Sequence, residues 1–178
     1  MDILQTDLRF YKKGYENASY IPWKAARECT QTLELFQDNV SMARTINGEL
    51  ANTGHKPIKK YKSVITCEDN HPIAFEGIWK WDIVCVECVQ RLVTAEVKKG
   101  GSVVLERRPV KGSVFLCTEG EIFQLKDPQQ GFQVKLDQSE GPGFISYRPI
   151  LEMIVIDVEM KTDEQKCTTI SKISLEEI

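Results

Sequence analysis

Four residues that can bind a metal lie close together in the segment TCEDNHPIAFEGIWKWDIVCVECVQRL, residues 66–92. Cys85 and Cys88 form a CxxC pair, the spacing at which two thiolates converge on one zinc ion from a tight turn. Cys67 and His71 supply a third sulfur and an imidazole, and the loop from His71 to Cys85 has a length found in zinc sites. Three thiolates and one neutral imidazole complete a tetrahedron, so the pattern predicts a structural zinc site and not a catalytic one.

The ligand set leaves alternatives open. Asp69 or His55 can replace His71 as the fourth ligand. A redox CxxC is typical of a βαβ unit, whereas the region that follows here reads as antiparallel strands. Cys29 is expected to be a small core residue, and the remaining cysteines are expected on strands. A second metal site would draw on Cys29, His55, Cys117 and Cys167.

Signatures of enzymes are missing from the sequence. It contains no GxSxG, HExxH or GxxxxGK[ST] motif, and only two histidines that could serve as a general base. A zinc deaminase needs Glu two residues after its His and Pro before its CxxC, but Ile73 and Val84 occupy those positions. We therefore expect no enzymatic activity. The enzyme hypothesis that remains is an unfamiliar site on the C-terminal sheet, with titratable groups of shifted pKa in a cleft.

Hydrophobic periodicity predicts the elements that position these residues. From Pro22 to about Thr45 apolar residues recur every three or four positions, which is typical of an amphipathic helix that stops at Asn47-Gly48. The segment KSVITCE reads as a short strand. After Cys88, VQRLVTAEVKKGG has helical spacing and ends at Gly100-Gly101. The CVEC motif is therefore predicted on the turn that opens a helix.

From Ser102 onward the apolar residues alternate or form short runs that turn sequences separate. This pattern predicts a mostly antiparallel sheet or small barrel. The predicted fold class is therefore α+β: an N-terminal amphipathic helix, a zinc-binding strand–loop–helix element, then the antiparallel part. We divide the chain into an N-terminal helical region (1–62), a zinc-finger element (63–101) and a β-rich region (102–178), together one compact domain.

The chain is expected to be soluble and intracellular. Its first residues mix charges with aromatics and lack the apolar stretch of a signal peptide, and no run approaches the roughly 20 apolar residues of a membrane helix. In a reducing compartment, closely spaced cysteines indicate metal binding more often than a disulfide.

Two groups of residues are candidates for binding a partner. Trp79 and Trp81 lie in the loop between the predicted ligand pairs, and Trp is favoured as an interface anchor, although both could instead pack on a small core of the zinc element. Lysines also surround Tyr61 and could contact phosphates of RNA or form a solvated linker. The net charge of −3 argues against strong non-specific RNA binding, so a protein partner is preferred. The candidate RNA-binding residues are Lys56, Lys59, Lys60 and Lys62.

The run WDIVCVECVQRLV, preceded by VITCEDNH, resembles the first-open-reading-frame protein of the sobemoviruses, a group of plant RNA viruses. In that family an aromatic-Asp-apolar-Val segment leads into CxxC and a charged helix, so that Cys67, Cys85 and Cys88 match its cysteines. His71 departs from the family pattern, which has a second cysteine two residues after the first. The similarity covers about 30 of the 178 residues.

The resemblance implies a non-enzymatic zinc-finger protein that suppresses host RNA silencing and supports viral spread in the plant. Such a protein acts in the host cytoplasm, with the nucleus as a second location. It would bind either a protein of the silencing pathway or small RNAs. The alternative is a generic zinc-stabilised interaction module of cellular or phage origin.

Overall fold

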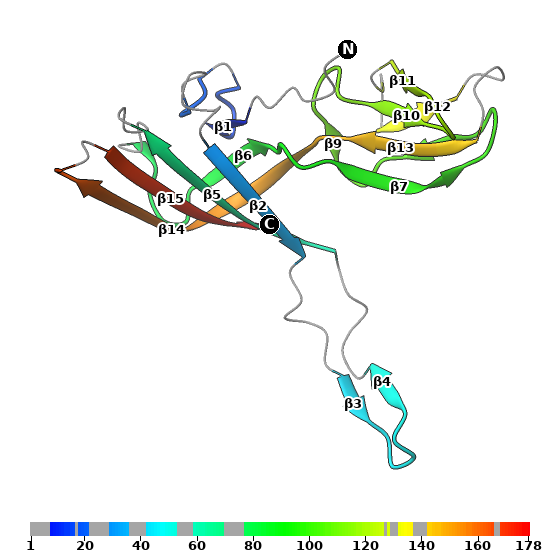
Figure 1. Cartoon of the computed structure of the whole chain (residues 1–178), viewed down its shortest axis with the longest axis horizontal. Helices are drawn as coiled ribbons and strands as arrows, with labels where there is room; N and C mark the ends of the chain where they lie inside the picture. The colour runs from blue at the N-terminus through cyan, green and yellow to red at the C-terminus, as the bar shows by residue number, and fades with distance from the viewer. Residues whose placement is uncertain are drawn as a thin grey trace.

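The structure, a computed structural model, describes residues 8–16, 18–21, 29–35, 42–52, 59–69, 77–126, 128, 132–136, 142–165 and 168–178. Within these ranges all long elements are β-strands and no α-helix is present (Figure 1). Every strand pairing is antiparallel. The strands are β1 (Arg9–Lys12), β2 (Cys29–Leu35), β3 (Met42–Arg44), β4 (Leu50–Asn52), β5 (Tyr61–Asp69), β6 (Ile83–Glu87), β7 (Leu92–Val97), β8 (Ser102–Val104), β9 (Arg108–Pro109), β10 (Phe115–Cys117), β11 (Ile122–Gln124), β12 (Gln133–Lys135), β13 (Gly143–Tyr147), β14 (Pro149–Asp163) and β15 (Thr168–Glu177).

The larger lobe is a sheet with the strand order β1-β6-β14-β15-β5-β2, to which β9 adds beside β14. Alternate residues of its strands point to one face and form the first hydrophobic core, because successive side chains of a strand lie on opposite faces. The segment before β2 also contributes to this core through Ile21. The buried residues of the core are Leu8, Phe10, Ile21, Ile65, Cys67, Ile78, Val84, Val86, Cys88, Leu151, Met153, Val155, Ile173 and Leu175.

The smaller lobe pairs β11-β10-β13-β7 in one sheet and β12-β8 in another. It has a hydrophobic core of its own, separate from the first. That core consists of Val97, Leu105, Val114, Leu116, Leu125, Val134, Leu136, Ile145 and Tyr147.

The chain crosses from the larger lobe to the smaller one between β6 and β7 and crosses back between β13 and β14 (Figure 1), and between these two crossings β9 also adds to the larger sheet. Arg148, only 5% exposed, lies at one crossing and donates from Nε to the carbonyl of Cys88 at the other, over 2.8 Å. Cys88 N–H in turn donates to Pro149 O at 3.0 Å. Arg91 bonds to Ser146 through the carbonyl (3.0 Å) and the hydroxyl (2.8 Å). Polar contacts thus join the two crossings and fix one lobe to the other.

A hairpin of β3 and β4 stands apart from both lobes (Figure 1). Its turn is closed by Thr45 N–H to Glu49 O at 2.9 Å and Gly48 N–H to Thr45 O at 2.8 Å. Gly48 has a φ of 81°, a conformation that glycine adopts without steric cost. Asn47-Gly48, predicted as the stop of a helix, is therefore a hairpin turn.

The predicted α+β fold is wrong, and its N-terminal helix is the first correction. Residues 29–35 form β2, and the flanking residues 22–28 and 36–41 lie outside the described ranges. Cys29 and Leu33 misled the prediction because residues four apart share a face in a helix and also in a strand. Cys29, Gln31 and Leu33 are the partly buried positions of β2, which is the two-residue period of a strand.

The predicted helix after CVEC is the second correction. CVEC begins within β6 and residues 92–97 form β7, so the expected strand–loop–helix element contains the strands β5, β6 and β7, of which β7 belongs to the other sheet. Val93, Thr94 and Val97 are β-branched and favour a pleated strand over a helix. Gly100 and Gly101 do not cap a helix but lie in a turn, where Gly101 N–H donates to Lys98 O at 2.9 Å.

Candidate interaction site

Trp79 and Trp81 lie on a tight turn just before β6. The turn is tied to the larger sheet, because Trp81 N–H donates to Val155 O at 2.8 Å and Val155 N–H donates to Asp82 O at 3.0 Å. Trp81 has a φ of 76°, which is uncommon for a residue with a side chain. Ile78, just ahead of the turn, is 8% exposed and belongs to the first core. The turn is thus anchored at both ends.

Asp82 closes this turn with its side chain. Its Oδ2 accepts the backbone N–H of Trp79 at 3.0 Å, and its own N–H donates to Trp79 O at 3.1 Å. Its Oδ1 lies 3.3 Å from Nζ of Lys12, on β1. The bond from the Trp79 amide, followed by Lys12, lowers the pKa of Asp82 below its ordinary value. The carboxylate therefore stays ionised and keeps the turn closed at neutral pH.

The two indole side chains of this turn face solvent. Trp79 is 75% exposed and Trp81 is 72% exposed, so neither packs on a core of its own chain. Lys80 between them pairs with Asp157 of β14 at 2.8 Å. Ile83, at the start of β6, is 42% exposed and extends the apolar surface. We call Trp79, Trp81 and Ile83 the tryptophan site. Large exposed aromatics on an anchored turn are suited to entering a pocket of a partner.

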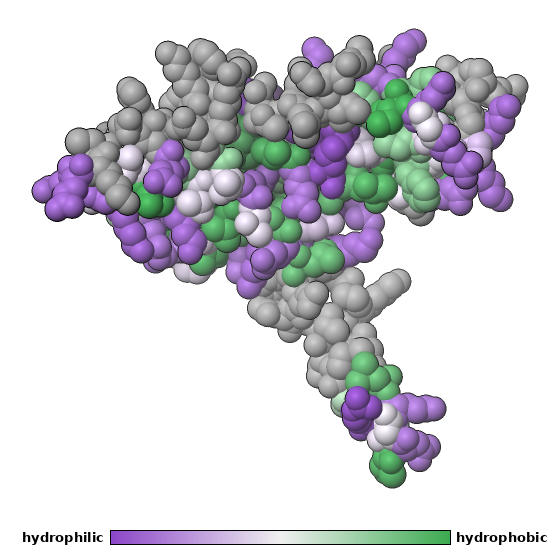
Figure 2. Space-filling view, in the orientation of Figure 1, coloured by the Kyte–Doolittle hydropathy of each residue, from purple (hydrophilic) through white to green (hydrophobic). Residues whose placement is uncertain are grey.

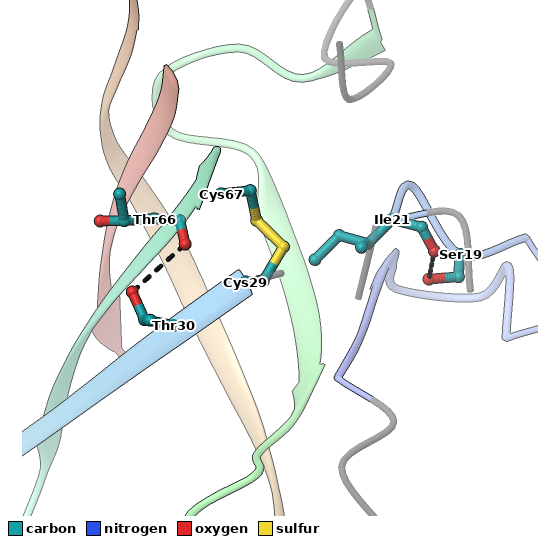
Figure 3. Close-up of a disulfide and its surroundings, with 6 residues drawn as sticks. All are labelled: Ser19, Ile21, Cys29, Thr30, Thr66 and Cys67. Carbon is teal, nitrogen blue, oxygen red and sulfur yellow. Dashed lines mark hydrogen bonds between the residues drawn. A yellow bond between two sulfur atoms is a disulfide. The ribbon is translucent and has the colours of Figure 1, made fainter. Parts of the chain in front are cut away.

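Cys67 is not available as a free thiolate. Its sulfur is bonded to that of Cys29, its direct partner across β2 and β5, with the two Cα atoms 4.1 Å apart (Figure 3). Next to the bond, the Thr30 hydroxyl donates to Thr66 O at 3.3 Å, and Ile21 points toward the two sulfurs. Cys29, expected as a small core residue, packs against the first core through this disulfide.

Cys85 and Cys88 do not converge. Cys88 lies with Val84 and Val86 in the first core, whereas Cys85 is not part of it and pairs with Tyr11 and Glu152 on its neighbouring strands. Residues three apart along a strand lie on opposite faces, so a CxxC cannot close on one ion while it is extended. Burial raises the pKa of both thiols, that of Cys88 to about 12. Neither thiol is prepared to become a thiolate at neutral pH.

The described residues therefore do not fit the predicted zinc tetrahedron. No cluster of three metal-binding side chains occurs in the described ranges. Cys117 lies in the other lobe, on β10. Of the further predicted ligands, His71, His55 and Cys167 are outside the described ranges.

Two of the four lysines proposed to bind RNA are in ion pairs. Lys59 Nζ lies 3.1 Å from a carboxylate oxygen of Glu106, and Lys62 Nζ lies 3.3 Å from one of Glu176. Lys60 is half-buried, and Lys56 is outside the described part of the chain. Carboxylates beside the lysines reduce the positive potential that would attract phosphates.

No protein-family model and no curated protein matches the chain. Within the described ranges, moreover, no helix is both long and apolar enough to span a membrane.

Two features of the site were missed in the sequence. Asp82 closes the tryptophan turn, and an Asp placed three residues after Trp79 could have indicated this, since Asp side chains often bond to nearby backbone in turns. The Cys29–Cys67 bond had no comparable signal. These residues are 38 apart, and only the pairing of β2 with β5 makes them neighbours.

Proposed function

We propose that this protein is a non-enzymatic binding protein that captures a protein partner through the tryptophan site. The observation that carries the proposal is the exposure of Trp79 and Trp81, 75% and 72%, on a turn anchored to β14 and closed by Asp82. Holding two large aromatic side chains in water is unfavourable, and an anchored turn lowers the entropy lost when they dock. Both properties suit an interface anchor.

We further propose that the partner belongs to the RNA-silencing machinery of a plant host, and that capture suppresses silencing and supports viral spread. The resemblance of WDIVCVECVQRLV to the sobemovirus protein supports this, and this run begins at Trp81 within the tryptophan site. The ion pairs of Lys59 and Lys62 favour a protein partner over small RNA. Zinc binding is not part of this proposal, because the described cysteines do not fit a zinc site.

A silencing-reporter assay in leaves tests the proposal. The full chain is expected to restore expression of a silenced reporter, as a known suppressor does, and Trp79→Ala with Trp81→Ala is expected to abolish the effect. Tyr15→Ala is the matched control, since Tyr15 is another exposed aromatic (66%) on the larger lobe and lies outside the tryptophan site. Both variants should unfold within about 0.5 kcal/mol of the parent, because they change exposed side chains.

Two results would overturn the proposal. If the reporter stays silenced in the presence of the parent chain, the protein does not suppress RNA silencing. Full activity of the tryptophan double variant, with both proteins present at equal levels, would remove the tryptophan site from the function.

A further inference from the structure

A second exposed apolar surface lies on the smaller lobe, on the outer face of the sheet β11-β10-β13-β7. The register places Ile122, Cys117 and Phe144 in one row across three neighbouring strands. Ile122 is 52% exposed and Phe144 is 47% exposed. Leu116 and Ile145, one position along, are fully buried in the second core and mark the opposite face. This row is therefore apolar and faces solvent.

A second row continues the same face. Phe115 pairs with Ser146, and Ser146 pairs with Val93, which is 64% exposed. The guanidinium of Arg91 lies over the Phe115 ring, 4.8 Å from its centroid, and its Nε donates to the Ser146 hydroxyl at 2.8 Å, so that Arg91 covers part of this second row. We call Ile122, Cys117, Phe144, Phe115 and Val93 the apolar strip. Figure 2 shows hydrophobic side chains, in green, at the surface over β10, β11 and β13.

The end of the strip near Phe144 is acidic. Glu96 is the cross-strand partner of Phe144, while Glu119 and Glu121 lie in the turn between β10 and β11. All three are exposed, and none forms an ion pair with another residue of the described ranges. Lys98 and Lys99 are the lysines nearest to Glu96 in the sequence, and they lie in the turn that connects β7 to β8.

We propose that the apolar strip docks a segment of a partner protein that carries large apolar side chains beside Lys or Arg. Aromatic and aliphatic side chains of the strip would be covered, and such residues are enriched in the cores of interfaces. The three glutamates would pair with the basic residues of the segment and accelerate its association. The same carboxylates repel nucleic acid and anionic lipid, which leaves a basic peptide as the complementary ligand.

A selection from a displayed library of random peptides on the full chain tests this proposal. Enriched peptides are expected to carry a net positive charge and at least two large apolar residues. Ile122→Ser with Phe144→Ser should weaken binding of an enriched peptide about tenfold or more, as for central interface residues. Val104→Ser, a 63% exposed position on β8 of the same lobe, should leave it unchanged. Replacing Glu119 and Glu121 by Gln should weaken it and reduce its dependence on salt.

The proposal would be overturned if the selection enriched neutral or acidic peptides or enriched none. It would also be overturned if the Ile122–Phe144 variant bound an enriched peptide as tightly as the parent chain does. Two further results would show that another molecule covers the apolar strip, and either would also overturn the proposal. One is a dimer in sedimentation that this variant dissociates. The other is binding to vesicles of phosphatidylserine and phosphatidylcholine that the same variant abolishes. Peptide binding should persist in the Trp79–Trp81 variant, so failure here is separate from failure of the tryptophan site.

Discussion

Asp82 and the backbone of Trp79 are joined by two hydrogen bonds across one turn. Asp82 Oδ2 accepts the Trp79 N–H at 3.0 Å, and Asp82 N–H donates to Trp79 O at 3.1 Å. Asp82 is the less exposed of the two, and its side chain is also held by Lys12. The position of the exposed Trp79 indole thus depends on Asp82, a residue that need not contact the partner protein.

Asp82→Ala is therefore expected to loosen the turn while leaving the fold intact. Loss of one partly exposed side-chain hydrogen bond should cost about 1 kcal/mol of unfolding free energy. Time-resolved anisotropy of the two indoles should show faster local motion, and reporter activity should decrease. The measurement uses a Trp23→Phe background, which removes the third tryptophan of the sequence. Asp157→Ala is the control, since it removes the ion pair with Lys80 but not the closure of the turn. Unchanged anisotropy in Asp82→Ala would contradict this account.

Closure of the turn is also expected to depend on pH. The Trp79 N–H, and after it Lys12, hold the pKa of Asp82 below its ordinary value of about 3.9. A carboxyl whose folded pKa is depressed stabilises the folded form above the unfolded pKa, and this contribution is lost as the pH falls through the folded pKa. Indole anisotropy should stay constant from about pH 5 to 8 and fall below about pH 4.

Two substitutions separate this effect from general acid unfolding. Asp82→Asn should abolish the acid-dependent change in anisotropy. Asp157→Asn should retain it, although Lys80 lowers the pKa of Asp157 as well. An identical acid profile in Asp82→Asn would show that another group controls the turn.

The sequence supported the local features better than the fold. Trp79 and Trp81 could be proposed as interface anchors because they lie in the loop between the predicted ligand pairs, although packing on a small local core was an open alternative. The secondary structure of residues 29–35 could not, since Cys29 and Leu33 satisfy helical and extended periods equally. Pairing of β2 with β5 depends on contacts between residues more than 25 positions apart, which local patterns do not contain. The separation of Cys85 and Cys88 on opposite faces of β6 could not be read from the sequence for the same reason, because a CxxC spacing brings two thiols together only where the backbone turns.

The Cys29–Cys67 bond is expected to contribute strongly to stability. It links residues 38 apart in sequence, and a loop of that length gives about 3–4 kcal/mol in the chain-entropy model. Cys29→Ser with Cys67→Ser, or treatment with a reductant, should lower the Tm by about 10 °C for a chain of this size. Thermal unfolding followed by circular dichroism measures this. A reductant should have no effect on the double variant, and an equal Tm with and without reductant in the parent would show that the bond is absent.

Cys85 and Cys88 give the sharpest test of whether this chain uses CxxC as a metal ligand pair. In the structure Cys88 is fully buried in the first core and Cys85 belongs to the other face of β6. Cys88→Ser places a hydroxyl in an apolar core and should cost about 1–3 kcal/mol of unfolding free energy. Cys85 is also buried, at 8% exposed, but it lies outside that core between Tyr11 and Glu152, so Cys85→Ser should cost less than Cys88→Ser. Urea unfolding with and without a chelator measures both.

Ligands of one structural zinc ion behave differently. Loss of either thiolate would release the metal and remove a free energy on the order of 10 kcal/mol, and the two variants would be equally unstable. A chelator would then destabilise the parent but neither variant. The structure predicts that the two variants lose different amounts of unfolding free energy and that a chelator has no effect. The reason is that successive side chains of β6 alternate between its faces, so the two sulfurs lie on opposite faces. Equal, large losses that a chelator reproduces in the parent would instead require the CxxC backbone to turn and the Cys29–Cys67 bond to open.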